Sequence, residues 1–236
     1  IRDRFSFICK PYERPRCTNK ESKLNKPVIA VDGTAGSGKG TLARRLADHF
    51  DYAYLDTGLL YRAVGFLTLE LTKGCKEISE DIACSTVSSI TPEILKNPLL
   101  RSEEITNYAS QIASLPAVRQ KLIERQQAFA QNPPEGSAGA VLDGRDIGTV
   151  ICPKAPFKFF LNAQIEVRAA RRLKELLEAG ETAIHSRVLK DIQERDARDK
   201  SRNIAPLVIA DDAVTLDTSK MNSNAVFFKA LEFINK

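Results

Sequence analysis

Apolar residues in this chain form two kinds of pattern, short continuous runs and longer stretches with a helical period. The runs predict buried strands at residues 28–31, 52–55, 140–142, 157–161 and 213–216. The periodic stretches predict helices near 39–50, 57–67, 79–89, 102–114, 116–131, 163–178 and 225–234, and one more that begins near 183 and leads into a charged run at 194–202. Strands that alternate with helices at short spacing predict an α/β fold, a five-stranded parallel sheet flanked by helices.

The first predicted strand runs into a glycine-rich segment with the sequence DGTAGSGKGT. Glycines let the backbone curl so that successive N–H groups point at one anion, and the following helix adds the positive end of its dipole. Lys39 supplies a full positive charge at the same place. The spacing Gly33-x4-Gly38-Lys39 therefore predicts a P-loop that holds a triphosphate. A tight turn without a ligand is the alternative, and the strand, the lysine and the helix in this order argue against it.

One position departs from the general P-loop pattern. Gly40 stands where Ser or Thr usually holds a metal ion, and the hydroxyl comes one residue later, at Thr41. This form of the loop resembles nucleoside monophosphate kinases more than GTPases or motor ATPases. It directs attention to residues that would bind a phosphate acceptor.

Polar residues follow two further predicted strands. Asp56 and Thr57 follow the second strand, where either residue would cap the next helix. The third strand leads into Asp-Gly-Arg-Asp at 143–146, and two acids beside a base at a strand end are costly to bury unless they bind something. Because open α/β sheets bind ligands at the carboxyl ends of their strands, we interpret both segments as parts of a site. A structural ion pair is the alternative for the second.

Other charged residues are ambiguous on spacing alone. Arg62 lies near the start of a helix, and a solvated surface charge is the simplest reading of it. The run Glu-Arg-Asp-Ala-Arg-Asp-Lys-Ser-Arg at 194–202 is typical of a solvated charged face. Arg168, Arg171 and Arg172 fall on one side of their predicted helix.

Composition places the chain among ordinary globular proteins. It has 236 residues, of which 43% are hydrophobic and 28% charged, and no uncharged apolar run approaches the ~18 residues that span a bilayer. The five cysteines, Cys9, Cys17, Cys75, Cys84 and Cys152, are odd in number and include no C-x-x-C pair. This favours reduced thiols and a cytoplasmic protein over disulfides or a zinc site.

The net charge of +5 is carried by residues 1–26, which hold eight basic and three acidic side chains. Residues 27–236 are therefore neutral in sum, which argues against a nucleic-acid-binding surface on the folded part. We expect this basic leader to be disordered or extraneous to the fold. Binding of RNA or membrane by the leader and a targeting role are alternatives, although a transit peptide would be poor in acidic residues.

Five motifs in order give a closer resemblance. They are the glycine-rich loop, Leu-Asp-Thr-Gly at 55–58 with Tyr61 and Arg62, Ala-Ser-Gln at 109–111, Asp-Gly-Arg-Asp-Ile-Gly-Thr at 143–149 and Glu-Arg-Asp-x-Arg-Asp at 194–199. With them the chain, from about Pro27 to its C-terminus, closely resembles the bacterial cytidylate kinases. The resemblance implies the P-loop nucleoside monophosphate kinase fold and ATP-dependent phosphorylation of CMP, and of dCMP as a second acceptor, by direct in-line transfer of the γ-phosphate.

The resemblance also implies a role for individual residues. ATP is expected on Gly33, Thr34, Ala35, Gly36, Ser37, Gly38, Lys39, Gly40 and Thr41. CMP is expected on Thr57, Arg62, Ser110, Arg119, Arg145, Asp146, Arg195, Asp199 and Arg202. The residues expected to act on the transferring phosphate are Lys39, Arg145, Arg202 and Arg168, the last by touching the donor phosphates. A Mg²⁺ ion is expected at Thr41 and, through water, at Asp143. No general base is assigned, since the attacking phosphate oxygen is already ionised.

The resemblance divides the chain into parts. The core is expected at 27–56, 132–180 and 204–236, the acceptor-binding region at about 57–131 and a lid at about 181–203. Related kinases often carry an extra antiparallel sheet in the acceptor region, and residues 80–101 look too short and too helical for it.

Three other functions remain as alternatives. A kinase for uridylate, thymidylate or a hydroxylated metabolite would share this scaffold, and Asp146 with Ser110 and Arg119 favours cytosine over them. A GTPase switch is disfavoured because no Asn-Lys-x-Asp guanine-reading motif is present, and an ATPase that depends on nucleic acid belongs to the same class. A binding module that uses the basic leader is the third. We expect a monomer with small-molecule substrates and neither a nucleic-acid nor a membrane partner.

Overall fold

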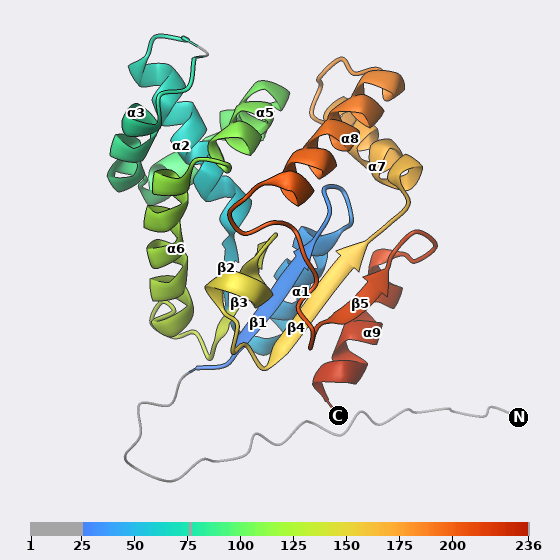
Figure 1. The fold of residues 1–236 in the computed structure, drawn as a ribbon. Helices are drawn as coiled ribbons and strands as arrows, with labels where there is room; N and C mark the ends of the chain where they lie inside the picture. Colours follow the sequence, from blue (N-terminus) through green and yellow to red (C-terminus); the bar gives the residue numbers. More distant parts are fainter. Residues whose placement is uncertain (1–25, 76, 236) are drawn as a thin grey trace, which may run out of the picture.

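The computed structural model describes residues 26–75 and 77–235, so the expectation for the leader falls outside the described residues except at Lys26. Five strands form one parallel sheet in the order β2-β3-β1-β4-β5 (Figure 1). They are β1 (Val28–Gly33), β2 (Ala53–Asp56), β3 (Ala140–Gly144), β4 (Phe157–Asn162) and β5 (Val214–Asp217). The predicted five-stranded parallel sheet is confirmed. With β1 in the middle, the loop that follows it opens at the centre of the sheet's carboxyl edge.

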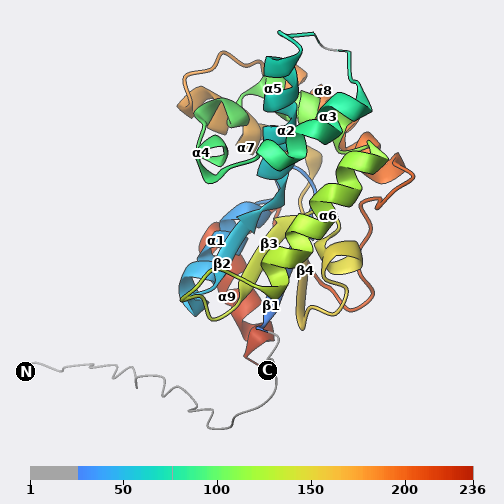
Figure 2. The same ribbon diagram turned by 90° about the vertical axis from the view of Figure 1, so that its left-hand side faces the viewer.

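Alternation along β1 assigns its side chains to two cores. Ile29 and Val31 pack against α1 (Lys39–Phe50) and α9 (Ser223–Ile234), which cover one face of the sheet. Ala30 points to the other face, where α6 (Pro116–Gln131) and the turn after β3 cover the sheet. Figure 2 shows α1 and α6 on opposite sides of the strands. Because successive strand residues alternate between faces, Asp32 shares the face of Ala30.

Two helical regions stand above the carboxyl edge of the sheet, on either side of the loop after β1 (Figure 1). The first contains α2 (Thr57–Leu71), α3 (Glu80–Thr86), η1 (Val87–Ser89), α4 (Pro92–Leu95), η2 (Pro98–Arg101), α5 (Glu103–Ile112) and the first half of α6, around a core of its own. The second pairs α7 (Ile165–Glu178) with α8 (His185–Ser201) through a small apolar cluster. The space between them therefore lies directly over the glycine-rich loop.

Most predicted elements are confirmed within a few residues, and three details differ. Two short helices that were not predicted begin at Pro92 and Pro98, because Thr91 and Asn97 cap them with their side chains and proline suits a first turn. The charged run at 194–202 belongs almost entirely to α8. A π-helical turn, η3 (Ile147–Ile151), follows β3 and was not predicted. Residues 80–101, all described, contain helices and turns and no strand, as their sequence suggested.

Candidate active site

The glycine-rich loop has the backbone shape that an anion site needs. Gly36 and Gly38 adopt left-handed φ angles of 73° and 87°, which side chains with a Cβ rarely tolerate. A Cβ at Gly33 would lie 2.1 Å from the carbonyl oxygen of Leu161, so glycine is required for β1 to run beside β4 here. Gly38 is the N-cap residue of α1, and no side chain in the described part of the chain caps this helix. The N–H groups of its first turn are therefore available to a ligand.

Lys39 begins α1 and faces a cavity of about 230 Å³ between the two helical regions. Burial, and then the positive charge of Arg145, lower the pKa of Lys39 to about 8. Within the described residues the ammonium group makes no hydrogen bond or ion pair. A cation held in this way favours an incoming anion, which would compensate for both burial and repulsion.

A second cavity, of about 160 Å³, adjoins the first and also contains Lys39 in its wall. All nine residues predicted to bind the acceptor line it, although they come from four parts of the chain. They are Thr57 and Arg62 from α2, Ser110 and Arg119 from α5 and α6, Arg145 and Asp146 after β3, and Arg195, Asp199 and Arg202 from α8 and its C-cap. The predicted acceptor residues are therefore brought together, next to the loop.

The cations of this cavity outnumber the acids that neutralise them. Arg145 donates from Nε to Asp199 at 2.8 Å, and this pairing raises the pKa of Arg145 although burial alone would lower it. Arg202 approaches the same carboxylate at 3.8 Å. Arg62 and Arg195 have no ion pair within the described residues, and burial lowers the pKa of both, that of Arg195 to about 9. Asp199 thus contacts two arginines, and the two arginines without an ion pair leave positive charge for a ligand with two negative charges.

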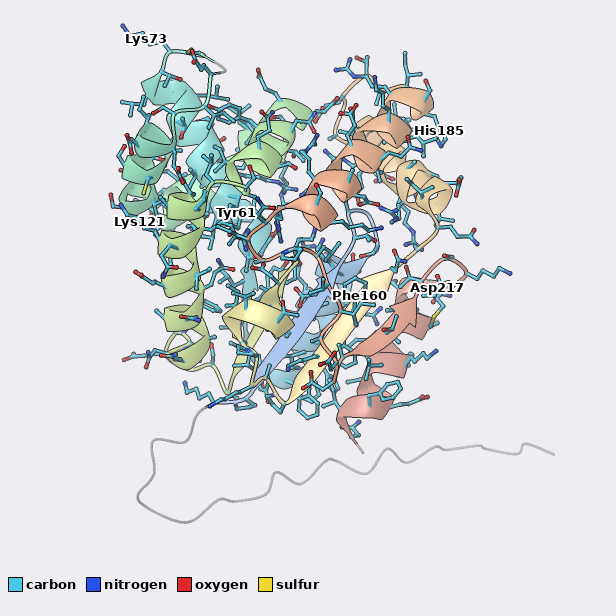
Figure 3. All side chains as sticks on the ribbon, viewed as in Figure 1. Tyr61, Lys73, Lys121, Phe160, His185 and Asp217 are labelled. Atoms are coloured by element: carbon cyan, nitrogen blue, oxygen red, sulfur yellow. The ribbon has the colours of Figure 1, made fainter. Side chains whose placement is uncertain are left out.

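Donors and acceptors of a different kind line the inner end of this cavity. Arg119 pairs through Nη2 with Asp146, and both side chains are almost completely buried. Arg119 Nη1 also donates to the carbonyl of Ala113 at 3.1 Å, and its guanidinium carbon lies 5.7 Å from the centre of the Tyr61 ring. Arg119 Nε and the Tyr61 hydroxyl are buried without a hydrogen-bond partner in the described residues. Figure 3 shows Tyr61 near the end of α2 that adjoins the sheet. Unsatisfied buried polar atoms that line a cavity indicate a place for a polar ligand.

Ser110, the third residue of the predicted base pocket, is also buried. Its hydroxyl accepts a hydrogen bond from Arg198 Nε at 3.2 Å, so α8 reaches across to α5. Arg187 and Glu103 form another link between these helices at 3.4 Å. The charged run of α8 is therefore not a plain solvated face.

Asp143 is the buried acid at the end of β3. Its carboxylate accepts a hydrogen bond from the Tyr54 hydroxyl at 2.8 Å, and burial raises its pKa. A Cβ at Gly40 would lie 2.9 Å from Asp143 Oδ2, so the glycine in this position of the loop lets the carboxylate approach it. Thr41 is exposed and lines the wall of the first cavity. One carboxylate and one hydroxyl fit a hard cation held mainly by phosphates and water, and the described residues contain no group of three metal-binding side chains.

The three arginines predicted on one side of α7 lie in different surroundings in the structure. Arg168 is 5% exposed and lies behind the loop, where it donates to the carbonyls of Ala163 and Ala35 at 2.8 and 3.2 Å and pairs with Asp196 at 2.7 Å. In this conformation Arg168 lines none of the cavities around the loop, and its contact with the donor phosphates stays a prediction. Arg172 alone of the three lines the first cavity.

A third cavity, of about 370 Å³, lies on the other side of the loop and was not predicted. Gly36, Gly38 and Thr41 form one wall of it, and residues 218–226 form another. Arg171 closes the end by donating from Nη2 to the carbonyl of Thr218 at 2.7 Å. Sequence reasoning missed Thr218 and Tyr54 because each acts through a contact with a residue distant in the chain.

The sequence model of one protein family, described as cytidylate kinase, matches residues 29–236. Curated proteins named cytidylate kinase are similar to the chain, among them those of Rhodospirillum rubrum (47% identical, over 88% of this chain and 96% of the relative) and Paramagnetospirillum magneticum (50%, over 88% and 97%). A solved sugar kinase from Janibacter sp. HTCC2649 is 14% identical over 89% of this chain and 95% of its own, with a TM-score of 0.45, a likeness too weak to carry an argument.

Proposed function

The chain belongs to the cytidylate kinase family, and from this premise we propose how its residues carry out the ATP-dependent phosphorylation of CMP. ATP occupies the loop from Gly33 to Thr41, with its triphosphate on the backbone N–H groups and Lys39 bridging the phosphate that is transferred. Its nucleoside part extends into the cavity between the loop and residues 218–226. The loop's left-handed glycines and the uncapped N-terminus of α1 support the position of the triphosphate, and the cavity of about 370 Å³ beside the loop supports that of the nucleoside.

The acceptor phosphate is held by Thr57, Arg62, Arg145 and Arg202, next to Lys39. At an intermediate dielectric constant, two unit charges at ~4 Å repel by roughly 4 kcal/mol, so two phosphates approach only where cations are already fixed. Positioning and charge neutralisation therefore do most of the work, and transfer proceeds in line between the two nucleotides. The observation that carries this proposal is the convergence of Arg62, Arg145, Arg195, Arg202 and Lys39 on one cavity.

Cytosine is read by Asp146 with Arg119 and Ser110. Cytosine presents an amine donor next to two acceptors, whereas uracil presents an acceptor and a donor at the first two of these positions. An acid that accepts from the amine and an arginine that donates to the acceptors therefore favour cytosine. Asp199 and Arg195 reach the ribose from α8. These ribose contacts would tolerate deoxyribose, and we propose dCMP as a second acceptor.

A Mg²⁺ ion bound with ATP would be held by Thr41 and, through water, by Asp143, and it would neutralise charge on the phosphates. Tyr54 fixes the direction of the Asp143 carboxylate, and Gly40 leaves room for it. Arg168 acts as a positioning residue, since it ties the loop at Ala35 to Asp196 of α8.

The parts of the chain have separate roles in this proposal. The core at 27–56, 132–180 and 204–236 carries ATP, residues of about 57–131 bind the acceptor, and residues of about 181–203 form a lid. The lid brings Arg195 and Arg202 over the phosphates and excludes water, which keeps ATP from being hydrolysed. We further propose a monomer that works in the cytoplasm without a nucleic-acid partner. No helix among the described residues is long and apolar enough to cross a membrane.

The test is an assay of ADP release with CMP, dCMP, UMP, dTMP, AMP and GMP as acceptors. We expect CMP and dCMP to be used well, UMP poorly and the others not at all. ATP should be consumed only slowly until an acceptor is added, whereas an ATPase switch would hydrolyse it in either case. Removal of residues 1–26 should leave activity unchanged, and a loss of activity would count against a role confined to residues 27–236.

A further inference from the structure

Asp32, the fifth residue of β1, is a buried acid for which the catalytic scheme has no use. It is 5% exposed and lines none of the three cavities around the loop. Its two carboxylate oxygens accept hydrogen bonds from the backbone N–H groups of Ile147 at 2.8 Å and Gly148 at 2.7 Å. The carboxylate therefore ties the central strand of the sheet to the turn that follows β3.

That turn, η3, carries one of the proposed base-reading residues at its start. Asp146 is its N-cap residue, with φ −144° and ψ 23°, and the N–H groups of Val150 and Ile151 donate to the Asp146 carbonyl. The side chain of the N-cap residue Asp146 makes no capping hydrogen bond to η3. The first N–H groups of η3 donate instead to the carboxylate of Asp32 on β1. Short π-helical turns of this kind occur frequently at functional sites.

Space around the contact is closely fitted. A Cβ at Gly148 would lie 3.1 Å from Lys158 Cδ and 3.4 Å from Asp32 Oδ2, so glycine lets the turn lie against both side chains. Ile147 and Ile151 pack into the core on the same face of the sheet as Ala30. The turn is thus fixed by apolar packing on one side and by the Asp32 carboxylate at its N-terminal end.

We propose that Asp32 is a positioning residue for base recognition: its carboxylate fixes the turn at Ile147 and Gly148 and thereby directs Asp146 toward Arg119 and the cytosine. This inference rests on the base-reading role proposed above for Asp146. Asp32 itself contacts no substrate, and its effect passes through the turn.

The chemistry of the contact requires a carboxylate and not an amide. Burial raises the pKa of Asp32 to about 6, while the two N–H groups and Arg145 oppose this rise, so the group is ionised at neutral pH. Both oxygens then accept, and each meets one N–H group. An asparagine of the same shape has one oxygen, and its amide nitrogen would place a donor against the second N–H group.

The test compares Asp32→Asn with the unchanged protein and with Asp48→Asn. The control makes the same chemical change at an exposed carboxylate near the end of α1, which packs on the opposite face of the sheet from the turn. For Asp32→Asn we expect the KM for CMP to rise about tenfold, the preference for CMP over UMP in kcat/KM to fall about tenfold, and the KM for ATP to change less than twofold. In hydrogen exchange, the amides of residues 147 and 148 should exchange at least tenfold faster. The control should leave all four quantities within twofold.

A merely structural role would loosen β1 and the loop that follows it. The KM values for ATP and CMP would then rise together with the preference for CMP unchanged, and this result would overturn the proposal. If Asp32→Asn does not fold, Gly148→Ala decides the question, since its Cβ would lie 3.4 Å from Asp32 Oδ2 and 3.1 Å from Lys158 Cδ and would press the turn away from both side chains. It should raise the KM for CMP two- to fivefold without changing that for ATP, and no change would reject the proposal.

Asp146→Asn is measured in parallel to separate the two levels of inference. If Asp146→Asn reduces the preference for CMP while Asp32→Asn does not, the role of Asp32 is wrong and the base-reading role stands. If neither substitution changes the preference, the base-reading role is wrong, and the inference about Asp32 falls with it.

Discussion

Replacement of Asp146 by asparagine tests how the kinase distinguishes cytosine from uracil. Asp146 is buried in a pair with Arg119, which is itself 1% exposed. Asp146→Ala would leave that arginine unpaired, and loss of one partner of a buried ion pair costs about 3–5 kcal/mol. Asparagine avoids most of this cost, because its oxygen still accepts from Arg119 while its amide nitrogen now donates.

The expected effect follows from the change in the hydrogen bond to the base. A hydrogen bond to a charged group contributes about 1.5–3 kcal/mol, so its loss lowers kcat/KM for CMP roughly 10- to 150-fold. The kcat/KM for UMP should rise, because the uracil carbonyl accepts a hydrogen bond from the new amide. Asp146→Ala should also raise the KM for CMP and reduce the preference for CMP over UMP. The KM for ATP should stay within twofold, since the proposed ATP site lies on the other side of Lys39.

The assay is ADP release at varied CMP and UMP, with urea unfolding to confirm that the variant is folded. Asp48→Asn is the matched control, since it removes one charge from an exposed carboxylate near the end of α1, on the opposite face of the sheet from the turn that carries Asp146. An unchanged ratio of kcat/KM for CMP and UMP in a folded Asp146→Asn variant would refute the reasoning. A rise in the KM for ATP equal to that for CMP would point to a general disturbance of the fold instead.

Three further predictions address the loop and its neighbours. Arg168→Ala should lower the free energy of unfolding in urea by about 3–5 kcal/mol, because it leaves the carboxylate of Asp196 buried without its partner. Lys174→Ala, on the exposed side of α7, should lower it by less than about 1 kcal/mol, and equal losses for the two variants would contradict this prediction. Burial lowers the pKa of Lys39 to about 8, so roughly three quarters of the Lys39 side chains are neutral at pH 8.5. ATP binding at this pH should therefore take up a proton, which calorimetry in two buffers detects. The affinity for ATP should fall as the pH rises further. No proton uptake would show that Lys39 is charged before ATP binds. Gly40→Ala should reduce kcat at least tenfold with the KM for CMP within threefold, since its Cβ would lie 2.9 Å from Asp143 Oδ2. A near-normal kcat would mean that catalysis does not need the close contact between Gly40 and the Asp143 carboxylate.

The sequence alone determined the features that depend on neighbours in the chain. The five strands, the order of the helices and the P-loop could be predicted because each follows from residue types at short, regular spacing. Several acceptor residues could be named as well, but only through the resemblance of five ordered motifs to a known family. Spacing by itself did not decide whether Arg62 and the charged run of α8 are surface charges or parts of a site.

Tertiary structure decided how distant residues meet. The helical period places Arg168 and Arg172 on one side of α7, yet only the packing of α7 against the loop and α8 directs Arg168 into a buried pair and Arg172 to the cavity. Asp32 and the turn at Ile147 are 115 residues apart, and no local pattern marks their contact. A strand's alternation tells which face a side chain takes, but the partner on that face depends on the order of the strands. That order is set by long-range packing, and for this reason the hydrogen bonds that fix the site could be found only in the folded chain.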